Sequence, residues 1–262
     1  MPLERPNFMS GRRTRLGRSR PRFAFTLLEL LVVIAIMAML AGLMLPTMAQ
    51  VRITARSAAC RSDVRQMVLA LHMYTHENNG WIFPQRQDFP GEGRLWWFGF
   101  EANGGPAAEG QRNLDRTRGR LWPYYQHTDS IEVCPSFPVQ SPHYKPKFNR
   151  NWTTYGYPQQ LMNPVAPTNT TQIRDTSQTL AFADSAQINV FQPPATPSNP
   201  MFEQWYYIAR FEQTVAYLHD RQANAAMFDG HVRTIEPQFG LNEIFPEAPV
   251  GRPPNDVVIQ VK

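Results

Sequence analysis

The segment HDRQANAAMFDGH, residues 219–231, contains four side chains that could ligate a metal ion or exchange protons. They are His219, Asp220, Asp229 and His231. Imidazole and carboxylate groups are ordinary zinc ligands, so a metal site is conceivable. However, an Asp-Gly pair between two apolar runs favours a tight type I′ hairpin turn, and this accounts for Asp229 and Gly230. The segment also lacks a nucleophile paired with a base. We therefore predict a hairpin with polar ends and neither a metal site nor a catalytic residue.

The two cysteines of the chain, Cys60 and Cys134, could react with each other. In an oxidising compartment they could close a disulfide. By the loop-entropy relation, a bond closing a loop of about 75 residues would contribute roughly 4–5 kcal/mol of stability. The alternative is two buried free thiols, since Cys is common in protein cores. The even number of cysteines favours the bridge, and we predict a Cys60–Cys134 disulfide.

The residues from 81 onward are interrupted by many prolines and by glycine-rich loops, with short apolar or β-branched runs between them. Such runs are typical of short strands. We expect strands at residues 131–134, 179–183, 214–218, 224–228 and 231–235, paired in one antiparallel sheet. The last two runs flank Asp229-Gly230 and form the clearest hairpin.

Before residue 81 the pattern is helical. An apolar run, Phe25–Leu45, would rise about 31 Å as a helix, close to the thickness of the membrane hydrocarbon. Apolar residues then recur at helical spacing among arginines, and Asn78-Asn79-Gly80 is a suitable stop. We expect one helix over 25–78, bent but not ended by Pro46. The recurring apolar residues are Val64, Met67, Val68, Leu71 and Tyr74.

These elements define the predicted organisation. Residues 1–24 form a basic leader, 25–46 the membrane-spanning half of the helix, 47–80 its exported amphipathic half, and 81–262 a globular head rich in β-structure. The predicted fold class is therefore α+β.

The net charge of +5 is unevenly distributed. The leader has seven arginines against one glutamate, whereas the rest of the chain has 19 Lys and Arg against 20 Asp and Glu. A nearly neutral body argues against nucleic-acid binding, which requires a basic folded surface. More arginines precede the apolar run than follow it closely, so the N-terminus is expected to stay cytoplasmic and the head to be exported.

Glu29 is unusual because it lies near the start of the apolar run, where burying a charge in lipid is costly. One explanation is that Glu29 reaches the headgroup region. The other is that the leader is removed before Phe25. The new amine of one subunit could then neutralise the Glu29 carboxylate of its neighbour in an assembled array.

The segment RFAFTLLELLVVIAIMAMLAGLMLP resembles the class III signal of type IV prepilins and type II secretion pseudopilins. The resemblance implies that a prepilin peptidase cuts between Ala24 and Phe25 and N-methylates Phe25. It also matches Glu29 to the acid five residues into the mature chain, and Pro46 to a proline that family members often carry twenty-two residues into it. The resemblance further implies a pilin-like layout, in which the exported half of the helix supports a globular head. Family members usually carry Gly before the cut, where this chain has Ala24.

The C-terminal segment resembles a motif found in a large subset of pseudopilin-like proteins, in which His, nine residues and Asp-Gly follow one another. The matching residues are His219, Asn224, Phe228, Asp229, Gly230, His231 and Val232. The segment TLAFADS, which includes Asp184, resembles an upstream strand of the same subset. The glycine that commonly follows the motif histidine is absent. The resemblance assigns the motif no biochemical role.

Together these features predict a structural pseudopilin-like subunit of a type II secretion or type IV pilus-like system, held in the bacterial inner membrane. Its expected partners are the prepilin peptidase and other pilin-like subunits. We expect no enzymatic activity and no cofactor. The alternative is a membrane-tethered exported carbohydrate-binding protein or hydrolase, with its site near His219 and Asp229. Trp96 and Trp97 could serve a sugar platform, but core packing is the more common role of such residues.

Overall fold

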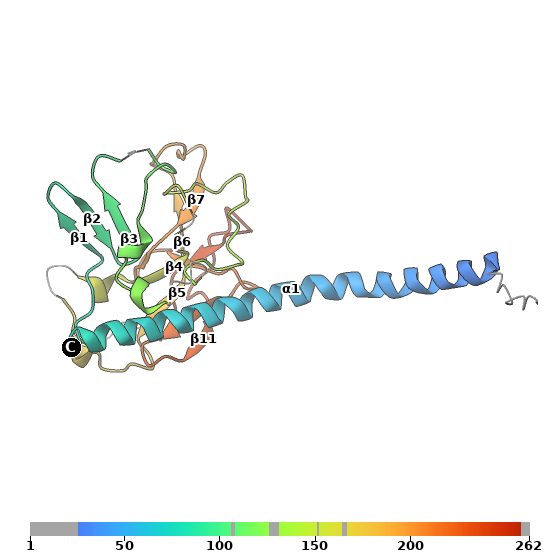
Figure 1. Cartoon of the computed structure of the whole chain (residues 1–262), viewed down its shortest axis with the longest axis horizontal. Helices are drawn as coiled ribbons and strands as arrows, with labels where there is room; N and C mark the ends of the chain where they lie inside the picture. The colour runs from blue at the N-terminus through green and yellow to red at the C-terminus, as the bar shows by residue number, and fades with distance from the viewer. Residues whose placement is uncertain (1–25, 106–107, 126–130, 151, 164–166, 258–262) are drawn as a thin grey trace, which may run out of the picture. The chain divides into compact units, whose positions relative to one another are not determined.

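The computed structural model describes residues 26–105, 108–125, 131–150, 152–163 and 167–257 (Figure 1). Its single α-helix, α1, runs from Leu27 to Glu77 and passes through Pro46 without ending. The helix that the sequence predicts is thus confirmed, and the bend at Pro46 stays a prediction. The chain divides into two units, residues 1–48 and 49–262, which are described separately below.

In the first unit, Leu27–Leu45 forms a helical stretch with a mean hydropathy of 2.6. None of its residues is buried by the described part of the protein. The stretch is long and apolar enough to cross a membrane.

In the second unit, α1 ends where the sequence predicts. Asn79 and Gly80 have positive φ angles of 53° and 81°, which leave the right-handed helical region. The amide of Gly80 donates to the carbonyl of Thr75, and the side chain of Asn78 donates to the carbonyl of Tyr74. These bonds satisfy carbonyls that the end of the helix would otherwise leave unpaired.

The head contains several small sheets among the described residues, which corrects the prediction of a single antiparallel sheet. The largest has the order β11-β10-β5-β4-β8, and its β4–β8 pair is parallel. Its strands are β4 (Tyr155–Pro158), β5 (Leu180–Asp184), β8 (Tyr207–Ile208), β10 (Ala223–Met227) and β11 (Val232–Ile235). The predicted strands at 179–183, 224–228 and 231–235 correspond to β5, β10 and β11.

The remaining strands form a meander and two pairs. The meander is β1 (Arg86–Phe89), β2 (Gly93–Trp96) and β3 (Gly99–Ala102). The pairs are β6 (Ala186–Asn189) with β7 (Met201–Gln204), and β9 (Val215–Ala216) with β12 (Val250–Gly251). Within the described ranges, four short 3₁₀ helices lie between strands: η1 (Arg116–Arg118), η2 (Trp122–Tyr124), η3 (Gln159–Met162) and η4 (Thr170–Gln172).

Two predicted strands differ from the structure. The run 214–218 forms only the short β9, which pairs with β12 outside the large sheet. The run 131–134 is a turn and not a strand. Its local bonds explain this, because the amide of Cys134 donates to the side-chain hydroxyl of Thr154 at 2.6 Å instead of joining a ladder.

The hairpin between β10 and β11 is confirmed, but its turn is not type I′. A type I′ turn needs positive φ at both central residues, and only Gly230, at 95°, has it here. The amide of Gly230 donates to the carbonyl of Met227, and the amide of Met227 donates to the carbonyl of His231. This pattern fits a three-residue loop that ends in a glycine.

The main core of the head lies between the second half of α1 and the large sheet. Val64, Met67 and Leu71 of α1 are fully buried in one hydrophobic cluster with residues of β4 and β5. Trp96 and Trp97 belong to the same cluster, with 7% and 0% of their surface exposed. Packing therefore accounts for both tryptophans, and neither offers an open platform for a sugar.

Replacing Leu71 with alanine is expected to destabilise the head by about 2–5 kcal/mol, because Leu71 is fully buried. For a domain of this size, that loss would lower the thermal unfolding midpoint by roughly 5–15 °C. The matched control is Leu69→Ala on the same helix, where the leucine is 49% exposed. Thermal unfolding of the full chain in detergent should show a large shift for the first variant only. Equal shifts would contradict the packing of α1 described here.

Candidate functional site

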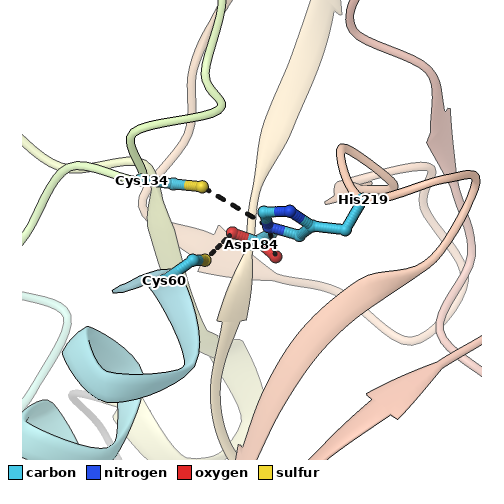
Figure 2. Close-up of side chains that lie close together, drawn as sticks. All are labelled: Cys60, Cys134, Asp184 and His219. Carbon is cyan, nitrogen blue, oxygen red and sulfur yellow. Dashed lines mark hydrogen bonds and ion pairs between the residues drawn. The ribbon is translucent and has the colours of Figure 1, made fainter. Parts of the chain in front are cut away.

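Four buried side chains with potential metal-ligand atoms meet where α1 contacts the head (Figure 2). Cys60 comes from α1, Cys134 from the turn at 131–134, Asp184 from the end of β5, and His219 from the loop between β9 and β10. We call these four residues the buried cluster. At most 4% of any of them is exposed. The sequence predicts a bond between Cys60 and Cys134, and the resemblance links Asp184 with His219, but neither brings the two pairs together.

Helix and strand periodicity explain how Cys60 and Asp184 come to lie in the buried cluster. Cys60 precedes Val64 by one helical turn, so both lie on the buried face of α1. Asp184 lies two residues after Phe182 in β5, and alternate residues of a strand share a face.

His219 lies at the base of a tight turn. Asp220 and Arg221 both have positive φ angles, 53° and 61°. His219 and Gln222 exchange two backbone hydrogen bonds across them. This is the backbone pattern of a type I′ turn, located nine residues before the Asp229-Gly230 turn that the sequence favours.

The ligand atoms of the buried cluster are close. The thiol of Cys60 donates to Oδ1 of Asp184 at 3.0 Å. Nε2 of His219 lies 3.2 Å from Oδ2 of Asp184 and 3.5 Å from Sγ of Cys134. The four ligand atoms all lie within 4.8 Å of one another.

Two neighbouring groups donate hydrogen bonds to the buried cluster. The hydroxyl of Tyr155 donates to Sγ of Cys60 at 3.2 Å, and the backbone amide of Asn224 donates to Oδ2 of Asp184 at 2.8 Å. Nδ1 of His219 is buried and has no hydrogen-bond partner among the described residues. Among the described residues, Nδ1 therefore has no hydrogen-bond partner with which it could exchange a proton.

Burial and close contacts shift the pKa values of three of these residues. Burial opposes the charged imidazole, but Asp184 and Cys134 outweigh it and raise the pKa of His219 to about 10. Burial, with Cys134 and Asp184, raises the pKa of Cys60 well above its usual value. Burial also opposes the thiolate of Cys134, yet hydrogen bonds with Cys60 and His219 lower its pKa.

The arrangement differs from a catalytic Cys-His-Asp triad. In a triad the nucleophile and the orienting acid bond to different nitrogens of the histidine. Here Cys134 and Asp184 both approach Nε2. The groups converge on one point, as ligands of a metal ion do.

Both cysteines are free thiols in the structure, which differs from the predicted disulfide. Cys60 donates a hydrogen bond to Asp184, and Cys134 contacts His219. The prediction that the two cysteines connect helix and head is nevertheless consistent with their positions in the buried cluster.

The structure separates the residues of the His-nine-residues-Asp-Gly motif. His219 and Asn224 both contact Asp184, whereas Asp229 and His231 pair with each other at the exposed hairpin, with Oδ1 and Nδ1 2.7 Å apart. The structure therefore gives His219 and Asp229 different partners and does not join them in one site. The motif positions a buried histidine at one end of β10 and a glycine turn at the other.

At the N-terminus, Thr26 and Glu29 cap α1. The hydroxyl of Thr26 accepts the amide of Glu29 at 3.2 Å, while the carboxylate of Glu29 accepts both the amide and the hydroxyl of Thr26 at 2.8 Å. This reciprocal pattern is a capping box. Its sequence signature, Thr followed three residues later by Glu, is present here but is not among the predicted features. The proposed processing residues, Ala24 and Phe25, lie outside the described residues.

Comparison with known families gives one match. Residues 19–45 match the family model of the prokaryotic N-terminal methylation motif. The match includes Ala24, Phe25 and Glu29 and ends directly before Pro46. No curated protein and no solved structure matches the chain.

This match agrees with the predicted prepilin-type signal at the N-terminus. It implies processing by a prepilin peptidase, and with the apolar helix it fits an exported protein anchored in the inner membrane. The head has an α+β pilin-like layout, with α1 packed against its sheet. The resemblance of the C-terminal motif stays a prediction.

Proposed function

We propose that this chain is a structural, pseudopilin-like subunit of a type II secretion or type IV pilus-like system. The observation that carries the proposal is the N-terminal methylation motif on an apolar helix whose second half supports a folded head. The apolar half would hold the subunit in the membrane before assembly and would pack against other subunits afterwards. The head would then be displayed on the surface of the fibre.

The buried cluster supports a structural role over an enzymatic one. Its four side chains are closed off from solvent, so a substrate could not reach them in this conformation. They also connect α1 to three segments of the head, which suits a subunit that must stay folded while it is drawn out of the membrane.

Removal of residues 1–50 distinguishes this proposal from the alternative of a tethered hydrolase or carbohydrate-binding protein. The full chain is expected in the sheared surface-fibre fraction of cells that carry a prepilin peptidase and a pilus-like system. The truncated chain, given a conventional secretory signal, should be exported but absent from that fraction. Immunoblots of sheared and soluble fractions measure both. Two results together would support the alternative. The full-length chain would be missing from fibres, and the truncated chain would keep a glycan-binding or hydrolytic activity.

A further inference from the structure

We propose that Cys60, Cys134, Asp184 and His219 bind one Zn²⁺ ion, which fastens helix α1 to the head. The inference concerns the folded head and does not depend on the proposed function. It replaces the expectation, drawn from residues 219–231 alone, that the chain has no metal site.

The donor set has the right chemistry for zinc. Zinc binds cysteine sulfur, histidine nitrogen and carboxylate oxygen, and its structural sites are almost always tetrahedral. The buried cluster offers two sulfurs, one imidazole nitrogen and one carboxylate. Soft thiolate ligands also disfavour Mg²⁺ and Ca²⁺, which prefer oxygen.

The distances fit a tetrahedral site. Zinc–ligand bonds of about 2.3 Å to sulfur and 2.0–2.1 Å to nitrogen or oxygen place tetrahedral sulfur and nitrogen ligands about 3.6 Å apart, and nitrogen and oxygen ligands about 3.3 Å apart. Sγ of Cys134 lies 3.5 Å from Nε2 of His219, and Nε2 lies 3.2 Å from Oδ2 of Asp184. Small side-chain movements would complete the coordination, because all four ligand atoms already lie within 4.8 Å.

The surroundings suit a charged, closed metal site. Two thiolates and one carboxylate around Zn²⁺ would leave a net negative charge. The hydroxyl of Tyr155 and the amide of Asn224 already donate to a sulfur and a carboxylate oxygen of the buried cluster. Such outer hydrogen bonds orient metal ligands and stabilise their charge. Because the protein supplies all four ligands, no position is open for a substrate, as is typical of structural zinc.

The site would link segments that lie far apart in the sequence. Cys60 belongs to α1, whereas the other three ligands come from the head. A metal ion at this junction stabilises the folded state because the unfolded chain does not hold its ligands together. A Cys60–Cys134 disulfide would use the same two sulfurs, so zinc binding and that disulfide exclude each other.

Metal analysis of the full chain tests the proposal. Protein extracted in detergent from cells grown with zinc is expected to contain one zinc per chain, measured by mass spectrometry of the metal. Denaturation in a chelator should then release two free thiols per chain. Cys60→Ser and His219→Ala should lose the zinc. The matched control, His231→Ala, removes an exposed histidine outside the buried cluster and should keep it.

A second measurement covers the case in which the variants do not fold. Wild-type protein reconstituted with Co²⁺ should show the absorption bands of a tetrahedral cobalt–thiolate centre. Removal of zinc by a chelator should lower the unfolding midpoint by about 10 °C or more. Two results with the wild-type protein would overturn the proposal: the absence of stoichiometric zinc, or a Cys60–Cys134 disulfide. Zinc retained by a folded Cys60→Ser variant would overturn it as well.

Discussion

The mature chain in membranes of peptidase-positive cells is expected to begin at Phe25, with residues 1–24 removed and the new amine methylated. The physical reason lies in the distribution of charge. Seven arginines hold the leader on the cytoplasmic side, and the apolar helix that follows stays in the membrane. Among the described residues the helix begins at Leu27, three residues after Ala24 in the sequence. Intact mass and the N-terminal peptide measure the result.

Variants at position 24 test which feature directs the cut. Ala24→Gly restores the residue that is usual in the resembling family and should be cut at the same bond. Ala24→Trp should accumulate with its leader, because a pocket for a small residue excludes a large ring. A peptidase-deficient host provides the uncleaved reference. Recovery of an intact leader on the wild-type chain in peptidase-positive cells would refute the assignment.

The sequence predicts the elements whose signals are local. The apolar run, the recurring apolar residues of α1 and the Asn-Asn-Gly stop predict a helix over 25–78, and the structure has Leu27–Glu77. The hairpin of β10 and β11 is equally local, because its strands are neighbours in the chain. These features depend on side-chain periodicity and turn residues, which can be read without tertiary structure.

The buried cluster could not be predicted in this way. Its four residues come from distant segments, and a sequence does not show which loops will meet. One signal was available, because the resemblance placed Asp184 and His219 in the same family subset. The turn at Asp220-Arg221 carries no such signal, since neither residue is a glycine.

Glu29→Gln is expected to reduce incorporation into fibres by about tenfold or more while cleavage and membrane insertion remain intact. The variant separates two roles of Glu29. In the structure its carboxylate caps α1 through Thr26, and glutamine can fill the same place in a capping box. Glutamine cannot neutralise the amine of a neighbouring Phe25, so only the charge-dependent role is lost. Insertion should not suffer, because a costly charge has been removed.

Thr26→Ala is the matched control, because it removes the hydroxyl of the capping box and keeps the carboxylate. If assembly depends on charge neutralisation, Thr26→Ala subunits should enter fibres nearly as well as wild type. Crosslinking with wild-type subunits and quantification of sheared fibres measure both variants in one experiment. The attraction between carboxylate and amine is strong in a low-dielectric surrounding, so its loss should outweigh the loss of one exposed cap. If Thr26→Ala fails and Glu29→Gln assembles normally, Glu29 serves the helix end and the neutralisation hypothesis is wrong.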